Sequence, residues 1–138
     1  MILQRGGRAW LRPFLATMAL GLLVAAGVWD VDPWLPLAVV LTAALGCLAP
    51  RFDALVMVKP QFEVGPGRVG KNGVVRDPEE RRAAIVDVAA SAYATVLGFA
   101  SSGLAGPKGN RETFVWLAEP GRPGGVADVE AAVRDVDP

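Results

Sequence analysis

An α/β fold is predicted by three segments in the second half of the chain. Residues 54–58 (ALVMV) form a short continuous apolar run, which is typical of a strand buried on both faces of a sheet. Residues 77–80 (DPEE) have the form of a helix start, with an aspartate cap, a proline in the first turn and a glutamate placed for a capping box. Residues 113–117 (TFVWL) are β-branched, aromatic and apolar, which favours a second strand with Trp116 in the core.

The composition of the 138-residue chain excludes several kinds of catalytic site. The chain has no histidine and one cysteine, Cys47. It therefore cannot hold a Ser-His-Asp or Cys-His arrangement or a Cys/His zinc cluster, and we expect no metal site. The 14 basic and 14 acidic side chains balance, so net charge gives no reason to expect binding to DNA. A lone cysteine forms no internal disulfide, which fits a reducing, cytoplasmic compartment.

The first 50 residues are strongly apolar. They carry five charged side chains: Arg5, Arg8, Arg12, Asp30 and Asp32. Two uncharged runs occupy residues 13–29 and 33–50. One interpretation is a small membrane-associated protein with an apolar hairpin at residues 14–48, although each run is shorter than the roughly 20 residues that span a bilayer. The alternative is that both runs are buried elements of the α/β domain.

The first predicted strand ends at Lys59 and Pro60. Residues 61–73 that follow are rich in glycine and indicate a long irregular loop, of the kind that carries function. Ligands of open parallel sheets bind at the carboxyl ends of the strands. Lys59, at such an end, is therefore a candidate functional residue.

The helix that starts at residue 78 is predicted to continue to about Leu97. One apolar stripe recurs at spacings of three and four, and its members are Ile85, Val88, Ala89, Ala92 and Val96. Arg81, Arg82 and Asp87 are expected on or near the opposite face. A short strand or turn at 99–105, a tight loop at 106–110 and a weak helix within 126–135 complete the prediction, and residues 119–138 are expected to form a flexible tail.

Three stretches of sequence resemble one known family. They read VKPQFEVG at 58–65, RVGKNGVVRDP at 68–78 and GPKGNRETFVWL at 106–117. Together they are similar to the signature of the TlyA family, also called hemolysin A-like proteins, over roughly residues 44–118. The resemblance implies an FtsJ-like, Rossmann-type methyltransferase domain that uses S-adenosylmethionine to methylate ribose 2′-hydroxyls of ribosomal RNA. The implied partner is ribosomal RNA or a ribosomal subunit.

The resemblance also implies catalytic residues. The family uses a Lys-Asp-Lys-Glu tetrad, whose second lysine corresponds to Lys59 and whose glutamate corresponds to Glu112. The tetrad aspartate is best matched by Asp30, although the words that surround it in the family are absent and Asp30 also suits a turn. An ammonium group beside a ribose hydroxyl lowers the pKa of that hydroxyl or, once deprotonated, takes its proton, and a carboxylate orients the amine.

Several parts of the family pattern have no counterpart in residues 1–29. These are the first tetrad lysine, the glycine-rich turn that holds the cofactor and the acid that binds its ribose; an S4 domain is also missing. We therefore expect a partial Rossmann-like fold, with an unmatched apolar segment at residues 1–43 and the carboxyl-terminal half of the methyltransferase domain at 44–118. Truncation or a frame shift would explain the boundary, and we expect weak or no activity. No cofactor-binding residue is assigned.

Basic side chains on two loops are candidates for RNA binding. Arg68, Lys71 and Arg76 follow the first strand, and Lys108 and Arg111 lie in and after the second loop. Such a rim would bind RNA phosphates with salt-dependent affinity. The alternative is a solvated loop surface.

Overall fold

Three strands and four helices make up the part of the chain that the computed structural model describes, residues 37–106 and 108–137. In chain order the elements are α2 (Leu37–Leu45), β1 (Asp53–Val58), α3 (Pro60–Glu63), α4 (Pro78–Ser91), β2 (Thr95–Ala105), β3 (Arg111–Ala118) and α5 (Val129–Val136). Short 3₁₀ turns occupy Pro66–Arg68 and Lys71–Gly73. Asp30 and most of the unmatched segment 1–43 lie outside the described residues.

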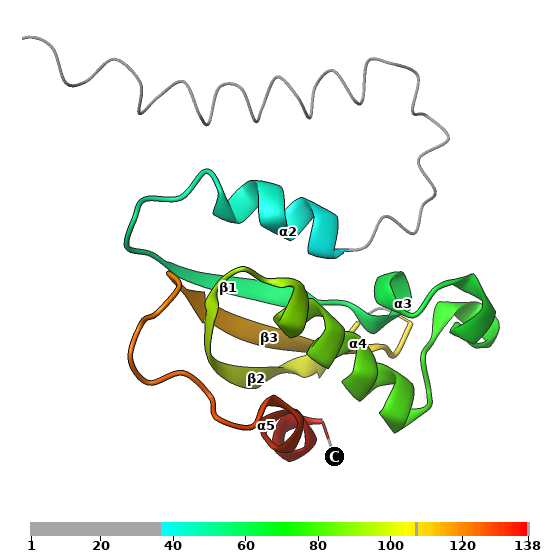
Figure 1. Cartoon of the computed structure of the whole chain (residues 1–138). Coiled ribbons are helices and arrows are strands. Elements are labelled where there is room, and N and C mark those ends of the chain that lie inside the picture. The colour runs from blue at the N-terminus through cyan, green and yellow to red at the C-terminus, as the bar shows by residue number, and fades with distance from the viewer. Residues whose placement is uncertain (1–36, 107, 138) are drawn as a thin grey trace, which may run out of the picture.

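The sheet has the order β1-β3-β2, with the last strand in the middle. β3 is antiparallel to both neighbours, so β1 and β2 run in the same direction. The connection from β1 to β2 passes through α4, which Figure 1 shows crossing in front of the strands. The mixture of a sheet with covering helices confirms the α/β fold class.

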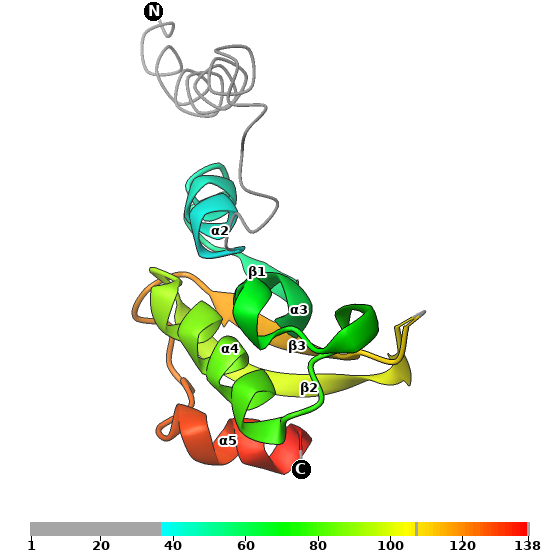
Figure 2. The ribbon, with the colours of Figure 1, turned by 90° about the vertical axis from the view of Figure 1, so that its right-hand side faces the viewer.

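The core lies between one face of the sheet and three helices. Each layer contributes fully or nearly fully buried side chains: Leu41 from α2, Val58 from β1, Ile85 and Val88 from α4, Val115 and Leu117 from β3, and Val133 from α5. Figure 2 shows α4 alongside the sheet, with α2 above it and α5 below. The helices α2, α4 and α5 therefore share a single core.

The opposite face of the sheet is not covered by the described residues. Leu55 is 71% exposed and Trp116 44% exposed, although each sits in a predicted strand. These two residues pair across β1 and β3 and point away from the helices. The prediction that residues 54–58 are buried on both faces is therefore wrong, as is the placement of Trp116 in the core. Trp116 Nε1 instead donates to Asp53 Oδ1 at the edge of the sheet.

The helix start at residue 78 is confirmed, but its predicted end is wrong. Asp77 Oδ1 accepts a hydrogen bond from Glu79 N at 2.9 Å, and Pro78 is the first helical residue. α4 ends at Ser91, because Ala92 takes an extended conformation. Val96, assigned to the apolar stripe of the helix, lies in β2 and pairs with Leu117. The short strand expected at 99–105 is thus the second half of an eleven-residue strand.

Residues 119–138, expected to be a flexible tail, contain α5 in a packed position. Asp128 caps this helix by accepting from Ala131 N, and Val133 on its inner face is fully buried. The preceding loop is also attached, since Val126 N donates to Val96 O of β2 at 2.8 Å. The structure differs from the expectation because an amphipathic helix this short is stabilised by packing, which local sequence does not reveal.

No helix among residues 37–106 and 108–137 is long and apolar enough to cross a membrane. Of the proposed hairpin at 14–48, the described part includes α2, whose nine residues pack Leu41 into the core. The remainder of the hairpin lies outside the described residues.

Candidate functional site

Lys59 and Glu112 meet at one end of the sheet. Lys59 directly follows β1, and Glu112 is the second residue of β3. The cross-strand pair Val58↔Thr113 sets these neighbouring residues side by side, and Lys59 Nζ forms an ion pair with Glu112 Oε1. The lysine side chain is 40% exposed and the glutamate 12% exposed. The lysine side chain is therefore partly open to solvent, whereas the glutamate side chain is largely buried.

The backbone after Lys59 fixes this arrangement. Lys59 has an extended conformation, as expected for a residue before proline, and Pro60 begins α3 as a buried residue. The chain thus turns sharply as β1 ends, and the lysine stands at the turn.

Asn110 joins the glycine-rich loop to the start of β3. Its Oδ1 accepts from Val75 N at 3.0 Å and its Nδ2 donates to Gly73 O at 2.8 Å. The residue is 5% exposed, so both bonds are sheltered from water. Sequence reasoning missed this role, although a polar residue between a tight loop and a strand is the available signal. Asn110, two positions before Glu112 in the sequence, thereby attaches the glycine-rich loop to the start of β3.

The glycine-rich loop is ordered by a close backbone contact. Gly70 and Val74 form an isolated antiparallel bridge, and a Cβ at position 70 would lie 2.7 Å from Val74 O. Only glycine fits at that distance without a backbone shift. The loop therefore has a defined shape where the sequence indicated irregular structure.

Glu63 is the last residue of α3, the helix that follows Lys59. Its carboxylate accepts from Leu37 N at the start of α2. Burial raises the pKa of Glu63, and the hydrogen bond from Leu37 opposes that rise. This contact ties α3 to α2.

The predicted RNA-binding residues divide into two groups. Arg68 is engaged within the fold, because its guanidinium donates to Val64 O and to Glu80 Oε2. Lys71, Arg76 and Lys108 are exposed. Arg76 and Lys108 also line one pocket of about 470 Å³, whereas Lys71 is not among its lining residues.

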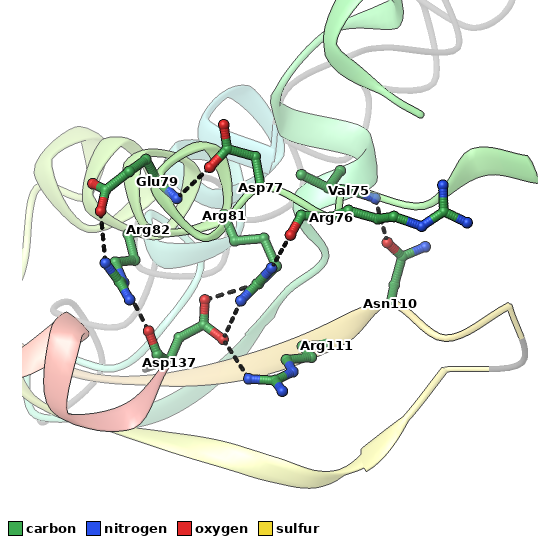
Figure 3. Close-up of polar contacts among 9 residues, drawn as sticks. All are labelled: Val75, Arg76, Asp77, Glu79, Arg81, Arg82, Asn110, Arg111 and Asp137. Atoms are coloured by element: carbon green, nitrogen blue, oxygen red, sulfur yellow. Dashed lines mark hydrogen bonds and ion pairs between the residues drawn. The ribbon is translucent and has the colours of Figure 1, made fainter. Parts of the chain in front are cut away.

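The same pocket is lined by Arg111, a further RNA-binding candidate, and by Arg81, which was not among the candidates. Arg81, expected on the outer face of α4, is 6% exposed and donates from Nε to Asp137 Oδ2 at 2.9 Å. Arg111 Nη1 lies 3.6 Å from Asp137 Oδ1. Figure 3 shows the Asp137 carboxylate between Arg81 and Arg111, with the Arg76 guanidinium directed away from it. The burial of Arg81 could not be foreseen, because its partner is 56 residues away.

Neither of two pockets formed by the described residues fits S-adenosylmethionine. The pocket of about 470 Å³ is lined by four cationic side chains and no acidic one, so it would repel the sulfonium cation of this molecule. A pocket of about 260 Å³ between α4 and α5 is lined by neither Lys59 nor Glu112. Within the described part of the chain no cluster of acidic, histidine or cysteine side chains could hold a metal ion.

Comparison with known proteins finds proteins that are similar to this chain. No family model matches the chain. The chain is 45% identical over 87 residues to the 16S/23S rRNA (cytidine-2′-O)-methyltransferase TlyA of Mycobacterium tuberculosis, a match that covers 61% of this chain and 32% of that protein. It is 33% identical over 91 residues to YqxC of Bacillus subtilis, a candidate rRNA methyltransferase, with 64% and 32% covered.

Two solved structures are also similar to this chain. A candidate hemolysin of Lactococcus lactis superposes with a TM-score of 0.64 at 27% identity, covering 74% of this chain and 51% of that one. A candidate hemolysin of Streptococcus thermophilus gives a TM-score of 0.63 at 27% identity, with 74% and 38% covered. The chain spans about a third of the length of the curated relatives it matches. Over the matched residues, this chain is similar to the rRNA methyltransferase TlyA and its relatives.

Proposed function

We propose that the chain carries the acceptor-binding half of a ribosomal RNA 2′-O-methyltransferase. The observation that supports it is the ion pair of Lys59 with Glu112 at the end of β1 and β3. The Mycobacterium tuberculosis relative is named for methylation of a cytidine 2′-oxygen in 16S and 23S rRNA. The proposed partner is accordingly ribosomal RNA or a ribosomal subunit, in the cytoplasm.

The pair suits chemistry at a ribose hydroxyl. A hydroxyl oxygen gains negative charge as its proton leaves, and an ammonium group within hydrogen-bond reach stabilises that charge. Lys59 presents its ammonium group with 40% of the side chain exposed, so a ribose can approach it. Glu112, 12% exposed, holds the amine in place from the protein side. Lys59 is thus the proposed catalytic residue and Glu112 its orienting partner, with Asp30 as the third candidate outside the described residues.

The methyl donor proposed from the resemblance is S-adenosylmethionine. Because neither of these two pockets fits it, we propose that the chain by itself binds this donor weakly and transfers methyl groups weakly or not at all. The acceptor half of the site is then separable from the donor half, and each can be tested alone.

The decisive experiment transplants the segment. The 87 aligned residues of the Mycobacterium tuberculosis relative are replaced by those of this chain, and transfer of labelled methyl groups to ribosomal subunits is measured. We expect the chimera to be active and its Lys59→Ala variant to lose activity by about a hundredfold or more. Arg51→Ala, which removes a cation that is 85% exposed beyond the other end of β1, should keep its activity.

Two results would contradict the proposal. One is a folded chimera, judged by its circular dichroism and thermal transition, that transfers no methyl groups. The other is a Lys59→Ala chimera as active as its parent. The intact chain is assayed in parallel, and vigorous transfer by it alone would refute the separation of donor and acceptor halves.

A further inference from the structure

The pocket beside the first turn of α4 concentrates positive charge. Its cationic side chains come from three places: Arg76 before the helix, Arg81 within it, and Lys108 and Arg111 around the start of β3. Among residues 37–106 and 108–137, Asp137 is the one acidic side chain that forms ion pairs with this set. Four cations against one carboxylate leave a surplus of three positive charges.

The charges in this pocket are not equivalent. Arg81 is buried and makes two hydrogen bonds to Asp137, so it forms the base of the pocket. Arg111 is 60% exposed and only 3.6 Å from the same carboxylate. In the described ranges 37–106 and 108–137, Arg76 and Lys108 form no ion pair, and both side chains are exposed. These two are free to neutralise an incoming anion.

The fold holds the two free cations near each other. Asn110 binds Val75 and Gly73 and so fixes the loop carrying Arg76 against the turn carrying Lys108. Lys108 Nζ lies 3.8 Å from the position that a Cβ of Gly73 would take. Figure 3 shows Asn110 reaching Val75 directly beside the Arg76 side chain. The cations thus stand on anchored backbone, and the ligand need not order a loop.

The pocket and the Lys59–Glu112 pair flank the same strand end. Arg111 and Glu112 are consecutive residues of β3, so their side chains leave opposite faces of the strand. A chain of nucleotides that bends around residues 106–110 would meet the ammonium group of Lys59 on one side and the pocket on the other. We propose that the pocket binds a backbone phosphate of RNA that flanks the ribose presented to Lys59, an inference that rests on the proposed function.

Phosphate is favoured over other anions by the donor set. Guanidinium groups bind phosphate oxygens through paired hydrogen bonds, and Lys108 adds a compact point charge. The first turn of α4 contributes less, because Asp77 already accepts from Glu79 N there. The side chains therefore supply most of the affinity.

The test uses the full chain and a short fluorescein-labelled single-stranded RNA, with affinity followed by anisotropy across a salt titration. Arg76→Gln and Lys108→Gln are each expected to weaken binding by about tenfold near 50 mM salt, with the loss vanishing at high salt, and to reduce the slope of log affinity against log salt by about 0.7. The matched control is Arg51→Gln, whose side chain is 85% exposed beyond the other end of β1. It should leave both quantities unchanged.

Three comparisons make the outcomes distinct. A DNA strand of the same sequence should lose the same factor in each pocket variant, because a phosphate contact does not read the 2′-hydroxyl. Inorganic phosphate, added as competitor, should displace RNA from the parent more than from the variants at matched ionic strength. Equal losses in Arg51→Gln and the pocket variants, or no loss in any, would overturn the proposal, as would a chain that binds no RNA.

Failure of the pocket is separable from failure of the proposed function. If Lys59→Ala abolishes methyl transfer in the chimera while Arg76→Gln and Lys108→Gln bind RNA as the parent does, the pocket is wrong and the function stands. If the pocket variants lose RNA affinity but the chimera is inactive, the phosphate site stands and the catalytic proposal is wrong. Thermal transitions of all variants should match the parent, since both side chains are exposed.

Discussion

Arg81 Nε donates a hydrogen bond to Asp137 Oδ2 over 2.9 Å and joins two residues that are 56 positions apart in sequence. Both side chains are almost fully buried, at 7% and 4% exposure. Arg82 adds a second attachment, from Nε to the backbone oxygen of Asp137. The end of α5 is thereby fixed to the first turns of α4.

Replacing Arg81 with methionine should destabilise the fold strongly. The change leaves the Asp137 carboxylate buried without its main partner, which costs about 3–5 kcal/mol in free energy of unfolding. Urea denaturation followed by circular dichroism measures it. Arg134→Met removes an exposed pair with Glu130 and should cost less than about 1 kcal/mol. Equal effects of the two substitutions would contradict this account, and the double variant Arg81→Met/Asp137→Leu should recover part of the loss.

The Asn110→Ala variant should loosen the glycine-rich loop. Val75 N, on a residue that is 3% exposed, would lose its acceptor, which costs about 1–3 kcal/mol. Denaturation gives the free energy, and hydrogen exchange should show faster exchange of the Val75 amide. Ser102→Ala, which removes an exposed local hydrogen bond, should change stability by less than about 0.5 kcal/mol. Unaltered protection of the Val75 amide would show that Asn110 does not hold the loop.

Glu119 should make stability depend on pH in the acid range. Hydrogen bonding from Arg122 lowers the pKa of Glu119 from 4.5 to about 2. The folded state then binds fewer protons than the unfolded state between these values, so the contribution is complete above pH 4.5 and is lost as pH falls toward 2. The Glu119→Gln variant should show a shallower loss of stability across this window, measured by urea denaturation at several pH values.

A second substitution checks the cause of that pH dependence. Arg122→Gln removes the donor to Glu119 and should flatten the same part of the profile. If the parent, Glu119→Gln and Arg122→Gln have parallel profiles between pH 4.5 and pH 2, the pair does not govern acid stability.

S-adenosylmethionine should bind the isolated chain no more tightly than the millimolar range. The physical reason is the cationic lining of the larger pocket, which opposes a sulfonium ligand. Isothermal titration calorimetry makes the measurement, with the Mycobacterium tuberculosis relative as the positive control. Micromolar binding by this chain would mean that a donor site exists and that the donor and acceptor halves are not separate.

Local sequence predicted those elements whose signals are short in range. Asp77 caps α4 as expected, because the hydrogen bond of this cap joins residues that are only two positions apart, Glu79 N and Asp77 Oδ1. The apolar run of β1 and the β-branched run of β3 are strands. Residue patterns also placed Lys59 at a strand end, and the family resemblance supplied its partner Glu112; the structure brings the two into contact. Their catalytic role stays a prediction.

The errors have tertiary causes. Val96 satisfies a helical spacing and a strand propensity equally well, and pairing with Leu117 decides between them. Trp116 is apolar yet partly exposed, because helices cover only the other face of the sheet. The local sequence does not indicate which face of the sheet stays uncovered. Arg81 and Asn110 are polar residues whose burial depends on partners 56 and 35 positions away.

The central place of β3 determines when the sheet can form. β1 and β2 hydrogen-bond to β3 and not to each other, so neither has a neighbour until residues 111–118 arrive. A nascent chain grows from its amino terminus, so β1 stays unpaired while residues 59–110 are added, and β2 stays unpaired until β3 follows it. The unpaired edges of β1 and β2 need protection until β3 inserts between them. A ribosome that stalls before Arg111 would therefore expose an aggregation-prone intermediate.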